Sequence, residues 1–183
     1  MHKDKDAALV NDCKRGDRRA MTRLVSQYQR PVFNAAYRIL GNTDDAADAT
    51  QTVFLKVFEH LADYDQKFKF FSWVYRIAVN EALNQVKKRR SQESLDDGQA
   101  SSWQGPAEAL DSKRLCKRVQ DALMLLNEDY RTVVVLKHIS GCSYQQISEI
   151  LQLPEKTVKS RLYSARQLLK KTLQDDESDQ QGQ

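Results

Sequence analysis

One stretch of the chain, residues 91–112, is too polar to build a hydrophobic core, and it separates two basic stretches. It carries five acidic side chains and no Lys or Arg, and it contains Ser-Gln-Glu-Ser, Asp-Asp-Gly and Trp-Gln-Gly-Pro with little hydrophobic periodicity. A segment of this composition does not fold by itself. We therefore expect two small domains, residues 1–90 and 113–174, with 91–112 as a flexible acidic linker and 175–183 as a disordered acidic tail.

The composition favours helices in both domains. Gly and Pro together number nine, and charged residues make up 30% of the chain, which is typical of charge-rich helices rather than turn-dense sheets. The longest apolar run, 122–126, has five residues, far fewer than the roughly 18 that a membrane span requires. The charged N-terminus has no apolar stretch behind it, unlike a secretory signal. We expect an all-α, cytoplasmic protein without membrane insertion.

The cysteines and histidines do not indicate a cofactor or a catalytic centre. Cys13, Cys116 and Cys142 are far apart, without Cys-x-x-Cys spacing, and the three histidines are equally scattered. Such cysteines are typical of reduced cytoplasmic proteins. The sequence also lacks clustered carboxylates, metal ligands or an activated nucleophile at catalytic spacing. We predict no metal, no cofactor and no catalysis.

The distribution of charge favours nucleic acid as a partner. Residues 1–90 and 113–174 have net charges of +6 and +7, whereas 91–112 and 175–183 have −5 and −4. Two tethered basic modules attract a polyanion, and binding of the first raises the effective concentration of the second. A basic stretch is often only a solvated face, so the interpretation depends on the motifs.

The C-terminal module contains a helix-turn-helix pattern. Ser143 and Gln146 form a capping box for a short helix that ends at Leu151. A three-residue turn follows, and its Pro154 is placed to open a longer helix that continues at least to Leu173. Two further helices precede the pair, at 115–126 and from about 127 to the Gly141 stop. This order is typical of DNA-binding domains.

The longer helix has one apolar face and one polar face. Val158, Leu162, Ala165 and Leu169 share the face that packs inward. The opposite face carries donors and acceptors that reach base edges in a major groove: Lys156, Thr157, Ser160, Tyr163 and Ser164. The cations Lys159, Arg161 and Arg166 flank it, where phosphates would lie. A basic surface helix with nothing bound is the alternative.

The N-terminal module is predicted to be a helix bundle with a polar ridge. Asp17 caps a helix that Pro31 bends or restarts and that Gly41 ends, and the next helix begins at Asn42 or Thr43. On that next helix Phe54, Phe58 and Leu61 face the core. Asp48, Gln51 and Thr52 remain outside as a polar ridge.

Aromatic and basic residues alternate after this helix. The segment 63–71 contains Tyr64, Lys67, Phe68 and Lys69, and the following helix, about 72–90, places Arg76, Asn80 and Lys87 on one face. Rings stack on unpaired bases while cations hold the backbone, so this pattern suits single-stranded nucleic acid. Packing of the aromatics in the core is the alternative.

Three segments together resemble the extracytoplasmic-function (ECF) sigma factors of bacterial RNA polymerase. Residues 45–54, Asp-Ala-Ala-Asp-Ala-Thr-Gln-Thr-Val-Phe, resemble the family's D-A-x-D-x-x-Q-E-x-F. Residues 71–80 resemble F-x-W-L-x-R-I-A-x-N, and 157–166 resemble T-V-K-S-R-L-x-R-A-R. The resemblance covers almost the whole chain outside the linker and tail. It implies a region 2-like bundle and a region 4-like helix-turn-helix.

The resemblance also implies partners for each surface. Asp45, Asp48, Gln51 and Thr52 would bind the clamp helices of the largest subunit of core RNA polymerase. Asn80 and the loop 63–70 would bind an opened minus-ten element of promoter DNA, and the second helix of the helix-turn-helix would read the minus-35 duplex. An anti-sigma factor is a further implied partner. Sigma factors themselves do not catalyse, since melting is driven by differential binding.

The chain departs from the family pattern at a few positions. Thr52 replaces a common Glu on the ridge, while Lys156 and Ser164 replace a common Gly and Arg on the base-reading face. The promoter sequence is therefore not predicted. A stand-alone helix-turn-helix regulator remains the alternative function, and salt-sensitive operator binding without polymerase would favour it.

Overall fold

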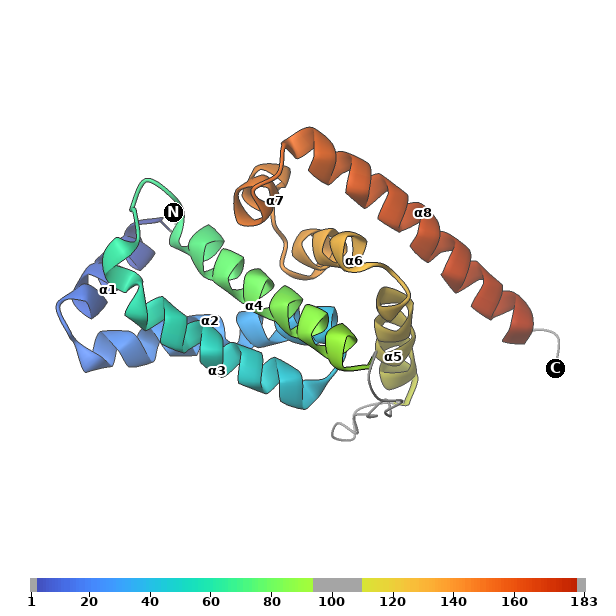
Figure 1. Cartoon of the computed structure of the whole chain (residues 1–183), viewed down its shortest axis with the longest axis horizontal. Coiled ribbons are helices and arrows are strands. Elements are labelled where there is room, and N and C mark those ends of the chain that lie inside the picture. The colour runs from blue at the N-terminus through green and yellow to red at the C-terminus, as the bar shows by residue number, and fades with distance from the viewer. Residues whose placement is uncertain (1–2, 94–109, 181–183) are drawn as a thin grey trace.

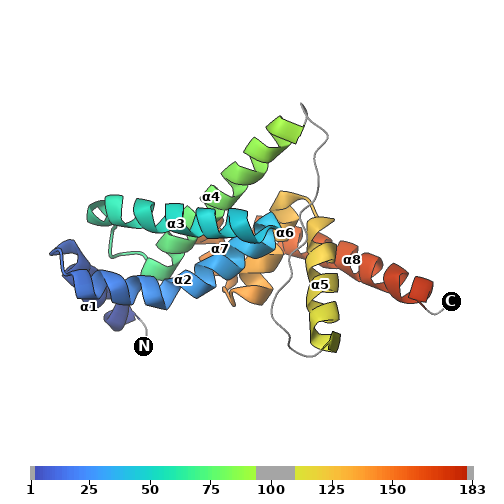
Figure 2. The same ribbon diagram turned by 90° about the horizontal axis from the view of Figure 1, so that it is seen from below.

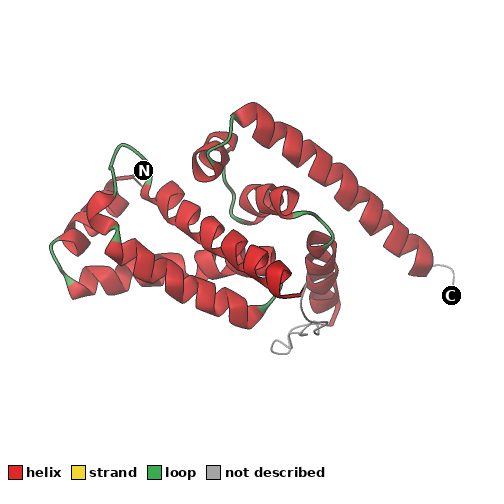
Figure 3. Cartoon of the chain, in the orientation of Figure 1, coloured by secondary structure: helices red, strands yellow, loops and turns green. Residues whose placement is uncertain are grey.

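The computed structural model describes residues 3–93 and 110–180, which form helices and short turns with no β-strand among them (Figures 1 and 3). The all-α prediction is confirmed. The N-terminal module contains α1 (Lys3–Lys14), α2 (Arg18–Leu40), α3 (Thr43–Glu59), the 3-10 helix η1 (Leu61–Asp63) and α4 (Phe70–Glu93). The C-terminal module contains α5 (Leu110–Met124), α6 (Glu128–Val134), the π-helical turn η2 (Val135–Ile139), α7 (Tyr144–Leu151) and α8 (Glu155–Gln180). No helix in the described ranges has the length and apolarity needed to cross a membrane.

Polar caps and one glycine end the N-terminal helices at the predicted positions. The Asp17 carboxylate accepts from the first N–H groups of α2, and Asn42 Oδ1 accepts from those of α3 at 2.8 and 3.0 Å. α2 ends at Gly41, whose φ of 76° is left-handed. A Cβ at this position would lie 2.7 Å from Met124 Sδ of α5. Both the backbone conformation and the available space therefore require Gly here.

We expected Pro31 either to bend the helix or to restart it. It does not restart the helix. α2 runs unbroken from Arg18 to Leu40 with Pro31 inside it. A proline in a helix removes one backbone hydrogen bond and crowds the preceding turn. Tyr28 and Val32 on either side of it are buried in the bundle, and the packing of this apolar face holds the helix together across the proline.

The N-terminal helices pack around a cluster of buried apolar side chains. It draws on α1, α2, α3, η1 and α4, and its most completely buried members are Val10, Leu24, Val32, Val53, Val57 and Val74. Phe54 and Leu61 are buried, as predicted, and Phe58 packs against the cluster. The bundle therefore leaves the polar side of α3 facing away from the core.

The predicted helix-turn-helix is present in the C-terminal module. Ser143 and Gln146 make both hydrogen bonds of the capping box at the start of α7. Gln152, in the left-handed conformation with φ 53°, ends α7. α8 begins at Glu155, directly after Pro154, and Val158 and Leu162 of its apolar face are buried. This turn fixes the direction in which α8 leaves the module.

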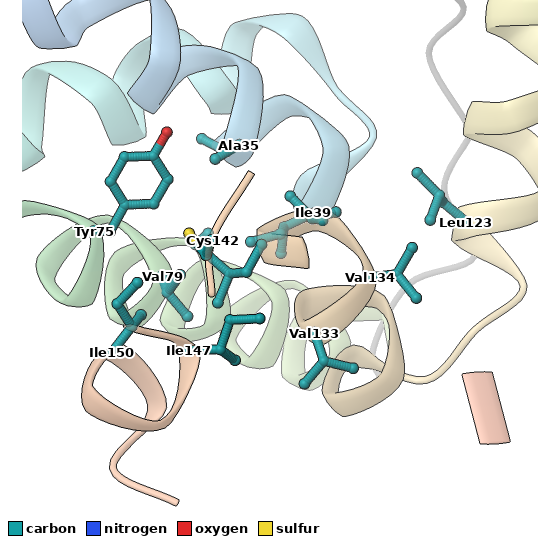
Figure 4. Close-up of a cluster of buried hydrophobic side chains, with 14 of the residues drawn as sticks. Ala35, Ile39, Tyr75, Val79, Leu123, Val133, Val134, Cys142, Ile147 and Ile150 are labelled. Atoms are coloured by element: carbon teal, nitrogen blue, oxygen red, sulfur yellow. The ribbon is translucent and has the colours of Figure 1, made fainter. Parts of the chain in front are cut away.

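The two modules share one hydrophobic core (Figure 4). Figure 1 shows α6 and α7 lying along α4, with α8 on their far side, and Figure 2 shows α5 beside the C-terminal end of α2. Labelled members of this shared core are Ala35, Ile39, Tyr75, Val79, Leu123, Val133, Val134, Cys142, Ile147 and Ile150. Each module thus completes the apolar burial of the other.

Polar contacts also cross between the modules. Arg131 Nη1 donates to the Ile39 carbonyl at the end of α2 at 2.6 Å, and Arg90 of α4 pairs with Glu128 of α6 at 2.6 Å. Ser72 Oγ lies 3.1 Å from Glu149 Oε2. The Ser72 and Arg90 contacts lie towards opposite ends of α4 and the Arg131 contact lies at the end of α2, so together they define one orientation of the C-terminal module on the N-terminal bundle.

The helices extend beyond the predicted module boundaries. α4 continues to Glu93 and α5 begins at Leu110, so residues 91–93 and 110–112 of the predicted linker are helical, and 94–109 lie outside the described residues. α8 continues to Gln180, so the prediction of a disordered tail is wrong for 175–180. No Gly or Pro occurs between Leu173 and Gln180, and extending an existing helix costs much less than nucleating one. Residues 181–183 lie outside the described range.

Candidate nucleic-acid interface

The polar face of α8 lies on the surface, as its sequence predicts. Lys156, Lys159, Ser160, Tyr163 and Arg166 are exposed, whereas Thr157, Arg161 and Ser164 are half-buried. Tyr163 is 67% exposed although it is a large side chain. Lys156, Ser160 and Tyr163 therefore lie opposite the buried stripe of Val158, Leu162 and Ala165, and the other five predicted contacts lie on the two flanks of the helix.

The three predicted phosphate contacts differ in how they are held. Arg161 forms an ion pair with Asp129 at 2.8 Å and its side chain is 27% exposed. Lys159 Nζ lies 3.4 Å from Glu155 Oε2 and 5.4 Å from the centroid of the Tyr144 ring. A phosphate must compete with these carboxylates for either cation. Arg161 is more buried than Lys159, so it is less available to a phosphate.

Arg166 has a neutral partner instead of a carboxylate. Its Nε donates to His138 Nε2 at 3.3 Å. Burial, and then Arg166 itself, lowers the pKa of His138 below its ordinary value, so the imidazole is uncharged at pH 7. The histidine therefore orients the guanidinium without neutralising its charge.

Binding of duplex DNA weakens as salt rises, and Arg166→Ala is expected to make this dependence shallower. The slope of the logarithm of the association constant against the logarithm of the salt concentration should fall in magnitude by about one, since one phosphate contact is lost. Arg161→Ala should change the slope less, because Asp129 already holds that side chain at 2.8 Å. Anisotropy titrations of a labelled duplex at several salt concentrations measure both slopes. A wild-type slope for Arg166→Ala would remove this residue from the phosphate contacts.

The loop before α4 exposes one of the two aromatic residues that we predicted to contact DNA and buries the other. Tyr64 is buried, with its ring 5.2 Å from that of Phe70 and 5.3 Å from that of Trp73. Its hydroxyl donates to the Phe68 carbonyl at 2.6 Å. The structure thus places Tyr64 in the core, because it fits an aromatic cluster, and not on a DNA-contacting surface. Phe68 is 57% exposed.

The remaining predicted minus-ten residues lie in the loop beside Phe68 or along α4. Lys67 and Lys69 flank it and are exposed. Asn80 and Lys87 are exposed on α4 and Arg76 is half-buried, whereas Tyr75 and Val79 on the other face of α4 pack against the C-terminal module. The loop leads directly into α4, so one aromatic ring, several cations and an amide lie along a single path.

The exposed ridge on α3 includes an apolar residue that sequence reasoning missed. Asp48 and Gln51 are exposed, as predicted, and Leu55 in the next turn is 64% exposed. The spacing of four from Gln51 to Leu55 could have indicated that they share a face. Asp48, Gln51 and Leu55 are called the α3 ridge below. A single exposed leucine is ordinary on a protein surface, so Leu55 adds an apolar contact to the ridge but does not by itself indicate a binding surface.

Two other residues predicted on this ridge are turned towards the bundle. Asp45 is half-buried and pairs with Arg89 of α4 at 3.3 Å. Thr52 is half-buried. Helical geometry places both beside the ridge, on the flank next to α4. Asp45 therefore has a structural contact within the chain, and the α3 ridge is the more accessible surface.

The buried cysteines have the properties of packing residues. All three cysteines are free thiols, and Cys13 and Cys142 are buried. Burial raises the pKa of the Cys142 thiol to about 12, which suppresses the reactive thiolate. Within residues 3–93 and 110–180, no three His, Cys, Asp or Glu side chains gather as a metal site requires.

Comparison with family models assigns both modules. Residues 24–92 match Sigma-70 region 2, and residues 116–169 match Sigma-70, region 4. The first match covers α2 to α4 with the loop and the α3 ridge, and the second covers the helix-turn-helix. Their order along the chain is the order predicted for the two modules.

The curated relatives match over almost their whole length. The ECF RNA polymerase sigma factor SigW of Bacillus subtilis is 32% identical over 179 residues, which cover 91% of this chain and 95% of the relative. The RNA polymerase sigma-H factor of Pseudomonas aeruginosa is 31% identical, over 93% of this chain and 95% of the relative. The ECF RNA polymerase sigma-E factor of Escherichia coli K12 is 29% identical, over 92% of this chain and 94% of the relative.

Solved structures with both modules are also similar. CnrH, solved in complex with the cytosolic domain of CnrY, matches with a TM-score of 0.74 and 25% identity, over 92% of this chain and 97% of that one. The sigma factor RpoE of Bartonella quintana, solved with the anti-sigma factor NepR, matches with a TM-score of 0.71 and 25% identity, over 84% and 96%.

Proposed function

The chain belongs to the ECF family of RNA polymerase sigma factors, and we propose that it is an alternative sigma factor that binds core RNA polymerase, directs it to particular promoters and helps to open them. The observation that carries this function is the match of both modules, in order, over 95% of the SigW chain. A stand-alone regulator needs only the helix-turn-helix and would not require the matching N-terminal bundle. That alternative is therefore not favoured.

The C-terminal module supplies the contact with the minus-35 duplex. α8 projects Lys156, Ser160 and Tyr163 from one exposed face, and side chains of this kind read base edges in a major groove. Arg166, with its neutral partner His138, is the best placed of the three cations for the phosphate backbone. Duplex recognition in this assignment needs no rearrangement of the helix.

The N-terminal module supplies the contact with opened minus-ten DNA. Phe68 offers an exposed ring for stacking, Lys67 and Lys69 lie on either side, and Asn80 lies further along α4. An aromatic surface with nearby cations binds unpaired bases better than a duplex, in which the base faces are already stacked. This differential binding favours the open promoter.

The α3 ridge is the proposed contact with the clamp helices of the largest polymerase subunit. Asp48 and Gln51 offer polar groups, and Leu55 in the next turn offers an apolar contact. Catalysis belongs to the polymerase in this assignment, and the chain contributes recognition alone. Its place of action is the cytoplasm, where polymerase and chromosome are found.

An anti-sigma factor is the proposed inhibitory partner. The similar sigma factor RpoE was solved with the anti-sigma factor NepR, and the similar protein CnrH was solved with the cytosolic domain of CnrY. In this chain an apolar depression between α5, α6, η2 and α8, lined by Val119, Ile139 and Leu169 among others, supports a protein contact on the C-terminal module. The occupant would be displaced before promoter binding.

Gel filtration with bacterial core RNA polymerase, followed by transcription of a fragmented genomic library, tests the function. Co-elution and new, discrete start sites are expected for a sigma factor, and alignment of the starts delivers both promoter elements. A protein that binds duplex DNA but does not co-elute with core polymerase would instead be a stand-alone regulator.

Asn80→Ala is expected to impair promoter opening about tenfold while duplex binding changes little, because the exposed amide contacts DNA only after the strands separate. Permanganate reactivity of unpaired thymines measures opening, and a mobility shift measures duplex binding. Asn34→Ala, which removes an exposed asparagine from α2, is the matched control. Equal thymine reactivity in the wild type and Asn80→Ala would contradict the assignment.

A further inference from the structure

Helix α1 supports the loop that carries Phe68. Lys14, in its last turn, reaches across to η1, where Nζ donates to the carbonyls of Ala62 at 3.1 Å and Tyr64 at 3.2 Å. The same Nζ lies 5.8 Å from the centroid of the Tyr64 ring. Lys14 thus binds the point at which the loop leaves η1, where carbonyls lack helical donors.

Further hydrogen bonds connect α1 and Tyr64 to the tip of the loop. Gln66 Nε2 donates to Asn11 Oδ1 of α1 at 2.6 Å. The Tyr64 hydroxyl donates to the Phe68 carbonyl at 2.6 Å. Asp65 accepts from the Lys67 backbone N–H at 2.9 Å. One continuous set of contacts therefore leads from Lys14 through Tyr64 to the exposed ring of Phe68.

Helix α1 is itself firmly held. Val10 and Cys13 are buried in the bundle. At the other end of α1, Asp6 accepts hydrogen bonds from Gln27 at 2.8 Å and from the Tyr28 hydroxyl at 3.0 Å. Because α1 is anchored to α2 at both ends, its contacts with the loop restrain the loop relative to the whole bundle.

We propose that Lys14 is a positioning residue for opened promoter DNA, which holds the loop 64–69 in the conformation that presents Phe68, Lys67 and Lys69 to an unstacked base. The inference rests on the proposed function and extends it to a helix that lies outside the matched region 24–92. A loop already in its binding conformation loses less entropy when a base docks, so its affinity for single strands is higher.

The test compares Lys14→Met with Arg15→Met in holoenzyme formed with core polymerase. Both variants lose one positive charge at the end of α1, but Arg15 pairs with Asp12 instead of the loop. With a forked template whose minus-ten region is single-stranded, Lys14→Met is expected to bind about tenfold more weakly, as for the loss of one or two hydrogen bonds. Arg15→Met should bind like the wild type, and Lys14→Arg should restore most of the affinity.

Amide hydrogen exchange in the free protein provides a second readout that does not depend on polymerase. The N–H groups of Lys67 and Phe68 are bonded within the loop, and they should exchange faster in Lys14→Met than in Arg15→Met. Equal exchange and equal fork binding in the two variants would overturn the inference. An equal loss of fork binding and core co-elution in Lys14→Met would also overturn it, since that indicates general damage. Failure of the wild type to co-elute would instead refute the proposed function.

Discussion

Replacing Asp48 and Gln51 together by Ala is expected to weaken binding to core RNA polymerase by about 100-fold, which corresponds to about 1.4 kcal/mol for each side chain. Both residues are exposed on the α3 ridge beside Leu55, which is 64% exposed. Neither is counted among the core residues, so the variant should fold normally. Surface substitutions of this kind rarely change stability by more than about 0.5 kcal/mol.

Co-elution and competition with a labelled wild-type protein measure this loss. Gln29→Ala, at an exposed position of α2, is the control and should bind normally. The helical content and melting temperature of the double variant should match the wild type. Undiminished co-elution of a well-folded double variant would remove the α3 ridge from the polymerase contact.

Arg131→Met is expected to lower the free energy of unfolding by about 3 kcal/mol, because it removes a buried charged donor and leaves its acceptors unpaired. The Arg131 side chain donates to the carbonyls of Leu123, Met124 and Leu126 in the α5–α6 turn and to that of Ile39 in the N-terminal module. Burial lowers the pKa of this guanidinium, and the carbonyls that surround it satisfy its N–H groups.

Urea denaturation measures the change for Arg131→Met. Arg30→Met, which removes an exposed arginine from α2, should change stability by less than about 0.5 kcal/mol. Arg131→Lys should not recover the wild-type value, because a single ammonium cannot reproduce the planar set of donors. A loss below about 1 kcal/mol for Arg131→Met would mean that water replaces the missing donors.

Local features of the sequence predicted the ends of several helices correctly. Asp17, Asn42 and Ser143 cap helices where expected, and Gly41 ends α2. Capping depends on side chains and backbone groups within a few residues, so sequence neighbours contain the needed information. The same holds for the buried stripe of α8, which follows from helical periodicity.

Exposure of individual side chains was predicted less well. Helical periodicity places Leu115, Val119, Ala122 and Leu126 on one apolar face of α5, yet Leu115 and Val119 are 59% and 37% exposed, because other helices cover only part of that face. Tyr64 and Phe68 have similar sequence surroundings, yet one ring is buried and the other exposed. The choice depends on which ring fits between Phe70 and Trp73, and periodicity does not contain that information.

The sequence by itself determined the all-helical modules, the helix-turn-helix and the polar faces of α3, α4 and α8, because these depend on contacts between residues close in the chain. Only the tertiary structure decided how the modules pack on each other, which cations are already paired and how Lys14 reaches the loop. The Lys14–Tyr64 contact joins residues 50 positions apart in the sequence, and the Arg131–Ile39 contact joins residues 92 positions apart. Such contacts form only when distant helices bury their apolar faces together, and no local pattern specifies which partners then meet.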